Sequence, residues 1–159
     1  METRLQPRAL VDLMALKQNL RIDPNVDVFD QDLASKLSAA IAFAESFINR
    51  DLSRVPVISY PYARVTEIDL DPALHIVGVS VGGEEIQPSG WSYADKKLLI
   101  YGTGYDDTDV VTVETEWRHD IAVSVLMHAS SLWLNPTDSV ETLPKASRNL
   151  LSQYRTYAR

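Results

Sequence analysis

The sequence predicts an α+β fold that is mainly α-helical, with about four helices and a small antiparallel β-domain between the second helix and the long third helix. Three observations predict this fold. Apolar residues recur at spacings of three and four in the first and last thirds of the chain, as they do in amphipathic helices. The periodicity changes to two in the middle third, which is typical of strands. Pro56 and Pro61 end the first helical section, and Asn135-Pro136 stops the long helix of the last third.

We expect a single domain over residues 1–159, helical over 1–54, β-rich over 55–117 and helical over 118–159. The first helix is predicted from about Pro7 to Leu20, because the motif Asp23-Pro24-Asn25 interrupts it. The second helix is predicted from Asp30, as its N-cap, to Arg50. Four small residues make this helix slim and suit close packing within the chain or against a neighbouring copy: Ala39, Ala40, Ala42 and Ala44.

Two hairpins are expected in the middle third. Gly82-Gly83 lies between two strand-like runs, and a tight turn of that kind needs positive φ angles. Residues 94–96 form the second turn. The expected strands are residues 64–70, 74–81, 84–87, 91–93, 98–101 and 109–117.

In the last third, the spacing of apolar residues predicts a long helix over residues 118–134 that stops at Asn135-Pro136. A polar loop follows, and a final helix is expected over residues 145–157. Arginines gather toward the end of that helix, where positive charge suits the helix dipole.

Composition excludes several functions. The 159 residues contain no cysteine, which rules out disulfides, zinc–thiolate sites and cysteine nucleophiles. No apolar run approaches the roughly 18 residues that a bilayer crossing needs, so no membrane partner is expected. The net charge of −7 argues against a sequence-reading DNA-binding protein. Residues 55–117 alone hold three Lys/Arg against eleven Asp/Glu, for −8.

No catalytic or metal-binding arrangement is predicted. The histidines are scattered, and His119 and His128 are nine residues apart, which is not the spacing of a helical metal pair. The motif Asp106-Asp107-Thr108-Asp109 lacks the pattern of a calcium loop and is interpreted as a solvated acidic turn. Gly102-Thr103-Gly104 lacks the Lys-Ser/Thr of a phosphate-binding loop. We therefore expect neither an enzyme nor a cofactor.

Three stretches of the sequence are distinctive in their order. The opening helix ends in Leu20-Arg21-Ile22-Asp23, residues 33–52 form the second predicted helix and the segment after it, and residues 121–133 are followed by Leu143-Pro144 and then by residues 150–155. Together these stretches resemble the first helix, the second helix, and the long helix with its C-terminal segment in the head–tail connector (adaptor or head-completion) protein family of tailed bacteriophages.

The resemblance implies a non-enzymatic virion structural protein in the neck, made in the cytoplasm of a bacterial host. It implies a homo-oligomeric ring of twelve copies beneath the portal protein, with a stopper or tail-completion protein below it. DNA would pass through the ring without sequence-specific binding. The alternatives are another phage structural protein, such as a stopper or tail terminator, or a small cytoplasmic enzyme or ligand-binding domain.

Two sets of residues are predicted to carry this function. The C-terminal segment is expected to bind the portal because arginine and tyrosine are favoured at interfaces; its candidate residues are Arg148, Leu150, Leu151, Tyr154, Arg155, Tyr157 and Arg159. An acidic channel lining would repel phosphates and let DNA slide. The candidate lining residues are Glu84, Glu85, Asp106, Asp107 and Asp109, with Glu67 and Asp69. The alternative is that these carboxylates form a solvated exterior.

Overall fold

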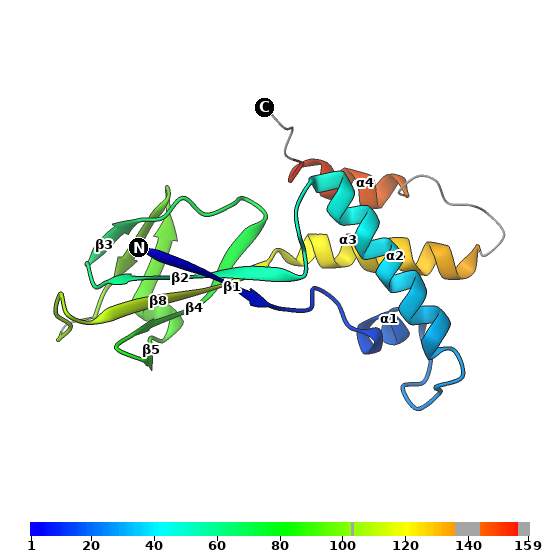
Figure 1. Ribbon diagram of the computed structural model, residues 1–159, viewed down its shortest axis with the longest axis horizontal. Helices are drawn as coiled ribbons and strands as arrows, with labels where there is room; N and C mark the ends of the chain where they lie inside the picture. The colour runs from blue at the N-terminus through cyan, green and yellow to red at the C-terminus, as the bar shows by residue number, and fades with distance from the viewer. Residues whose placement is uncertain (103, 136–143, 156–159) are drawn as a thin grey trace. The chain divides into compact units, whose positions relative to one another are not determined.

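The chain folds into four α-helices and two antiparallel β-sheets (Figure 1). The computed structural model describes residues 1–102, 104–135 and 144–155. Two compact units are present. The β-unit comprises Met1–Arg8 and Arg54–Trp117, and the helical unit comprises Ala9–Ser53 and Arg118–Arg159. The predicted α+β class, with a β region between the second and third helices, is confirmed.

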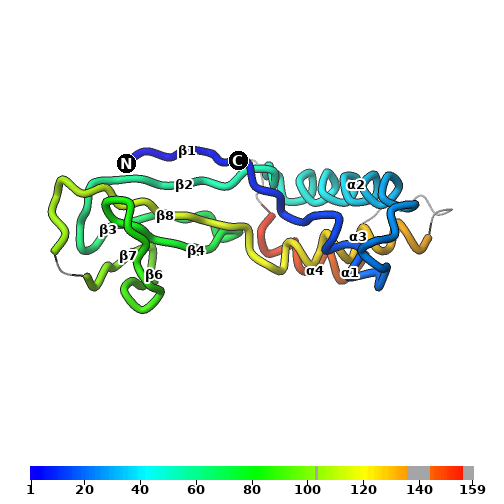
Figure 2. The backbone as a smooth tube through the Cα atoms, turned by 90° about the horizontal axis from the view of Figure 1, so that it is seen from below, coloured from blue at the N-terminus to red at the C-terminus, as the bar shows by residue number. Residues whose placement is uncertain are grey.

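The β-unit contains a five-stranded sheet in the order β1-β2-β8-β4-β5 and a three-stranded sheet in the order β3-β7-β6. Figure 2 shows β1 lying outermost, beside β2. The strands are β1 (Glu2–Pro7), β2 (Arg54–Pro61), β3 (Val65–Glu67), β4 (Leu74–Val81), β5 (Glu84–Glu85), β6 (Trp91–Ala94), β7 (Lys97–Ile100) and β8 (Val110–Trp117), with a short 3-10 turn (Pro88–Gly90) before β6.

Both predicted hairpins are present. β4 and β5 are joined by Gly82 and Gly83, whose φ angles are 60° and 88°. β6 and β7 are joined by Asp95 and Lys96, which also adopt positive φ, at 50° and 62°. Left-handed backbone at both central residues matches the twist of the flanking strands, so each turn fixes the register of its hairpin.

The core of the β-unit lies between the two sheets. Alternate residues of β2, β4 and β8 face it, and Leu98 and Ile100 of β7 with Ile68 cover it from the second sheet. The buried cluster consists of Ile58, Tyr60, Ile68, Val79, Val81, Leu98, Ile100, Val111 and Val113. Because side chains alternate along a strand, the intervening residues lie on the opposite face of the five-stranded sheet, which we call the open face.

Two strands of the β-unit were not predicted. Residues 1–7 were assigned to the helical part, but β1 pairs with β2 over six residues. β2 contains Pro56 and ends at Pro61, and proline normally argues against a strand because it lacks an N–H donor. Here the carbonyl of Pro56 accepts a hydrogen bond of 2.6 Å from Thr115 Oγ1 on β8, which joins the two strands beside the proline.

The helical unit contains α1 (Leu13–Leu20), α2 (Asp30–Ile48), α3 (His119–Leu134) and α4 (Lys145–Ser152). All pairs among these helices except α1 with α4 are in substantial contact. Apolar residues on the helix faces form its interior: Leu16, Leu33, Leu37, Ala40, Ala44, Ile48, Ile121, Val125, Ala129 and Leu151 are all buried. The slim alanine face of α2 therefore packs, at Ala40 and Ala44, inside this chain.

The helix boundaries differ from the predictions by one or two residues at the end of α2 and the start of α3, and in more informative ways at three other places. α1 begins at Leu13 instead of near Pro7, because the Asp12 carboxylate accepts a 2.7 Å hydrogen bond from the backbone N–H of Ala15 and caps the helix there. Asp30 is the first residue of α2 and not its N-cap, and its carboxylate instead pairs with Lys17. α4 ends at Ser152, before the predicted limit at Tyr157, which lies outside the described residues.

Candidate interaction surfaces

The histidines do not form a site. Over residues 1–102, 104–135 and 144–155, no group of three or more His, Cys, Asp or Glu side chains could hold a metal ion. His128 is fully buried on α3, where its ring meets the Phe43 ring edge-on at 5.2 Å. Burial lowers the pKa of His128, so this side chain is neutral near pH 7. His128 is therefore a packing residue of the interior, and its ring is not accessible to a ligand on the surface.

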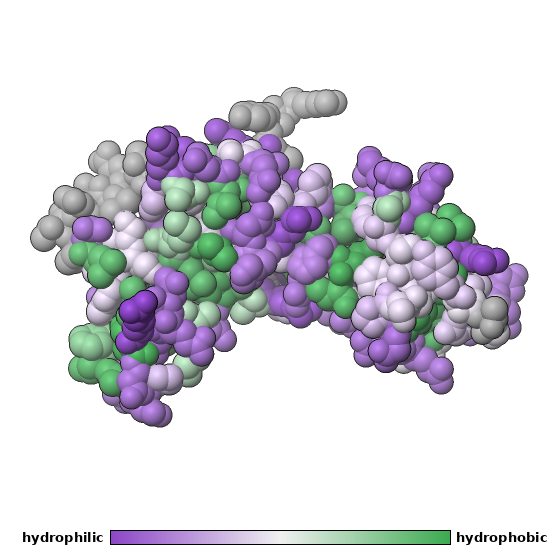
Figure 3. All heavy atoms as spheres, turned by 180° about the vertical axis from the view of Figure 1, so that it is seen from behind, coloured by the Kyte–Doolittle hydropathy of each residue, from purple (hydrophilic) through white to green (hydrophobic). Residues whose placement is uncertain are grey.

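Long apolar helices are also absent from the described part of the chain. None of its helices combines the length and apolarity that a bilayer crossing requires. Exposed large hydrophobic residues of the helical unit occur in the loop before α2 and on α1, α2 and α3: Met14, Val26, Val28, Phe29, Phe43, Met127 and Leu134. Figure 3 shows hydrophobic surface at several separate places among hydrophilic residues on each unit.

The candidate portal-binding residues divide into three groups. Arg148 and Arg155 are exposed and Leu150 is half-buried, so these three are accessible on α4 and just after it. Leu151 and Tyr154 are buried, with exposed fractions of 0% and 7%. Tyr157 and Arg159 lie outside the described residues. The sequence pattern identified the apolar ridge of α4, and the structure places the buried part of that ridge against the rest of the helical unit.

Polar contacts hold α4 and the residues after it in place. The hydroxyl of Tyr154 donates a 2.5 Å hydrogen bond to Asp120 at the start of α3, and Arg50 donates to the Tyr154 carbonyl. Burial, followed by this bond to Asp120, raises the pKa of Tyr154. Ser124 and Ser147, both fully buried, each donate to the other's backbone carbonyl at 3.1 Å and join α3 to α4.

Five of the seven candidate channel-lining acids come together at one end of the five-stranded sheet, whereas Glu67 lies on β3 of the other sheet and Asp69 pairs with Lys96 at 2.8 Å. Glu84 and Glu85 follow the β4–β5 turn, and the backbone N–H of Gly82 in that turn donates to the Val110 carbonyl at 3.0 Å. This bond places the β4–β5 turn beside the acidic turn that precedes β8, which contains Asp106, Asp107 and Asp109.

Two of these acids also shape their own turn. The carboxylate of Asp106 accepts hydrogen bonds from the Thr108 backbone and hydroxyl, and these bonds hold the pKa of Asp106 below its usual range. Asp109 accepts a 3.0 Å bond from the Asp106 backbone N–H. Glu84, Glu85 and Asp107 are exposed, so they are the members of the set whose charge can be changed without disturbing these bonds.

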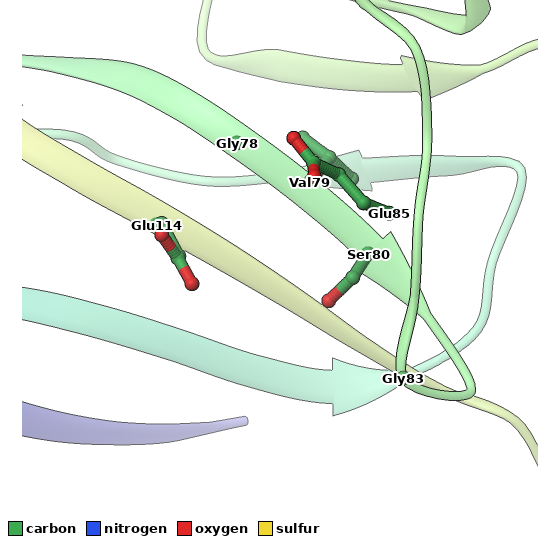
Figure 4. Close-up of a pocket in the computed structure, with 6 residues that line it drawn as sticks. All are labelled: Gly78, Val79, Ser80, Gly83, Glu85 and Glu114. Carbon is green, nitrogen blue, oxygen red and sulfur yellow. The ribbon is translucent and has the colours of Figure 1, made fainter.

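A hollow that the sequence did not predict lies on the open face of the sheet. It has a volume of about 240 Å³ and is lined by Gly78, Val79, Ser80, Gly83, Glu85 and Glu114 (Figure 4). Gly78 on β4 pairs with Glu114 on β8, and Glu114 Oε2 lies 3.8 Å from the position that a Cβ on Gly78 would occupy. In Figure 4, Glu114 and Glu85 lie on opposite sides of β4. Two carboxylates therefore border a space that glycine leaves empty.

Comparison with known proteins gives distant structural matches only. No protein-family model and no curated protein matches the chain. A chain of a solved structure described as "Neck of empty GTA particle computed with C6 symmetry" is 16% identical, with a TM-score of 0.47, over 98% of this chain and 97% of that chain.

Two further chains are similar to the same degree. One, from "Virion of native gene transfer agent (GTA) particle", is 15% identical with a TM-score of 0.46, over 98% of this chain and 96% of that one. The other, from "Neck of native GTA particle computed with C12 symmetry", is 17% identical with a TM-score of 0.43, over 98% and 97%.

Proposed function

We propose that this chain is a structural subunit of a phage-like virion neck, a head–tail connector that forms a ring of twelve copies beneath the portal and around the DNA channel. The observation that carries the proposal is the order of elements that follows β1: two helices, a β region, a long helix and a short final helix. That order coincides with the three stretches of sequence that resemble the connector family. A subunit that joins the head of a virion to its tail works through buried interfaces of complementary shape, and this requires no catalytic group.

Co-sedimentation with a matching portal protein, followed by negative-stain electron microscopy, tests the proposal. A ring added to the narrow end of the portal is the expected result. A chain that stays monomeric and does not sediment with that portal contradicts the connector function. A ring that binds a tail tube and ignores the portal favours a stopper or tail terminator instead.

The exposed part of α4 and its exit is the proposed portal contact. Replacing Arg148 by glutamate is expected to weaken portal binding at least about tenfold, because a charged contact at an interface is reversed. The folded structure should persist, since Arg148 is exposed. Deletion of residues 147–159 is a blunter test, because it also removes the buried residues Ser147, Leu151 and Tyr154.

Lys145→Glu provides the matched control for Arg148→Glu. Lys145 is exposed on the same helix, and its replacement makes the same change in charge. Sedimentation of each variant with the portal gives the binding, and circular dichroism gives the fold. Equal binding by the two variants would remove Arg148 from the portal contact.

The acidic end of the five-stranded sheet is the proposed channel lining. Glu84→Lys combined with Asp107→Lys replaces two exposed negative charges by two positive ones without removing the hydrogen bonds of Asp106 and Asp109. DNA should then leave filled particles more slowly, and more so at low salt, because lysines bind phosphates. Asp27→Lys, in the exposed loop before α2, is the control. Unchanged DNA retention and ejection would assign these acids to the solvated exterior.

A further inference from the structure

The five-stranded sheet has two open edges. β1 is the first strand of the sheet, and all six of its residues are exposed. At the other side, β5 pairs with β4 only at Ser80 and Val81. Among the described residues, no strand pairs with the outer edge of β1 or with the outer edge of β4 over residues 74–78. At Val79 this edge is already occupied, because the Val79 carbonyl accepts a 2.8 Å hydrogen bond from the Ile86 N–H. Open edges present unpaired N–H and C=O groups to which another chain can add.

The directions of the two edges are compatible. β1 is antiparallel to β2, β2 to β8, and β8 to β4, so β1 and β4 run in opposite directions. A β1 strand from a second copy, placed beside β4 by head-to-tail addition, would therefore continue the antiparallel alternation of the sheet. Head-to-tail contacts of one kind close into rings when the rotation between copies permits it.

The charges of the two edges are complementary. The strand register aligns Arg4, Val57, Glu114 and Gly78 in one row across the open face. Arg4 is exposed and has no ion pair within residues 1–102, 104–135 and 144–155. At the other end of the row, Glu114 and Glu85 border the hollow above Gly78.

The reach of an arginine fits this hollow. Neighbouring strands lie about 4.8 Å apart. An Arg4 on a strand added beside β4 would therefore lie one strand from Gly78 and two strands from Glu114. Because Gly78 has no side chain, nothing on β4 obstructs the guanidinium on its way to the two carboxylates. β1 contains charged residues and a proline and has no apolar run, so it would not pair with just any open strand edge. Its addition would depend on an edge with complementary charge, such as that of β4.

We infer that copies of this chain join by edge-to-edge addition, in which β1 of one copy pairs with β4 of the next and its Arg4 enters the hollow bordered by Glu85 and Glu114. This inference rests on the proposed function, because it names the contact that would build the ring. It assigns the N-terminal strand, which the connector resemblance did not include, to the assembly of the ring.

Cysteine cross-linking tests the contact directly, since the natural chain contains no cysteine. Leu5 on β1 is 57% exposed and Val77 on β4 is 38% exposed. Within one chain these strands are three spacings apart, about 14 Å, which is beyond the limit of about 7 Å between Cα atoms for a disulfide. A bond between Leu5→Cys and Val77→Cys can therefore form only between copies.

The double variant Leu5→Cys/Val77→Cys is oxidised alone and on the portal and examined on non-reducing gels. A ladder of dimers, trimers and larger species from the double variant, with neither single variant giving a ladder, is expected. Dimers from Leu5→Cys alone would mean that two β1 edges pair about a twofold axis, and would overturn the inference.

Charge exchange gives an independent readout by sedimentation velocity. Arg4→Glu should weaken self-association about tenfold or more, and adding Glu114→Arg should restore it. Arg64→Glu, another exposed arginine of the β-unit, is the matched control. Gly78→Val, which fills the hollow, should block assembly, whereas Gly78→Ala should fold because its Cβ would meet Glu114 only at ordinary contact distance.

The outcomes separate this inference from the proposed function. Rings of normal mass that neither cross-link nor respond to Arg4→Glu would overturn edge-to-edge addition and leave the connector function standing. A wild-type chain that stays monomeric, both alone and with the portal, would overturn both.

Discussion

Replacement of Lys17 by methionine is expected to lower the free energy of unfolding of the helical unit by about 3 kcal/mol. The Lys17 side chain is only 4% exposed, and its Nζ lies 2.5 Å from the Asp30 carboxylate at the start of α2. It also donates to the carbonyls of Pro24 and Val26, at 3.2 and 2.8 Å. Methionine keeps the apolar stem but leaves these acceptors without their cation, so the loop between α1 and α2 loses its anchor.

Lys36→Met is the matched control on α2. Lys36 Nζ lies 3.9 Å from Asp32 one turn away, and both side chains are more exposed, at 29% and 60%. An exposed pair of this kind contributes about 0.5 kcal/mol or less. Urea unfolding followed by circular dichroism gives both stabilities, and hydrogen exchange assigns the loss to the loop before α2. Similar losses for the two variants would mean that Lys17 acts only as a surface charge.

Lys17 contributes to the fold through contacts that no local sequence pattern contains. The hydrophobic periodicity predicted the two helices that it joins, and the glycine and Asp-Lys turns predicted both hairpins, because all of these signals are local. Lys17 stands among the apolar residues of α1, and the pattern does not reveal that a charged residue is buried there. Its partners lie in the loop and on the next helix, so only the fold brings them together.

The candidate surfaces were likewise predicted only where local sequence marks them. The connector resemblance led to the prediction of α4 and of the acidic turns as binding surfaces. The acids of the β4–β5 turn and of the turn before β8 lie at one end of the five-stranded sheet. The hollow above Gly78 could not be predicted from the sequence, because Gly78 and Glu114 become neighbours only through the pairing of β4 with β8. β1 was missed for a related reason. All its residues are exposed, so no alternation of apolar and polar side chains marks it as a strand.

Leu151→Ala is expected to lower the free energy of unfolding of the helical unit by about 3 kcal/mol. Leu151 is fully buried on α4, and its truncation leaves a cavity next to a helix of only eight residues. The reciprocal bonds between Ser124 and Ser147 and the Tyr154–Asp120 bond would then hold α4 with less apolar support. Amides of α4 should exchange with solvent faster than those of α2.

Leu150→Ala is the control that separates packing from portal binding. Leu150 is half-buried and adjacent to Leu151, so its truncation should cost about 1 kcal/mol. If α4 binds the portal in the conformation described here, Leu150→Ala will weaken portal binding while Leu151→Ala, kept below its unfolding temperature, will not. If α4 must first detach from the helical unit, Leu151→Ala will make detachment easier and strengthen binding. Loss of binding in both variants, in proportion to their loss of stability, would mean that the portal recognises only the intact helical unit.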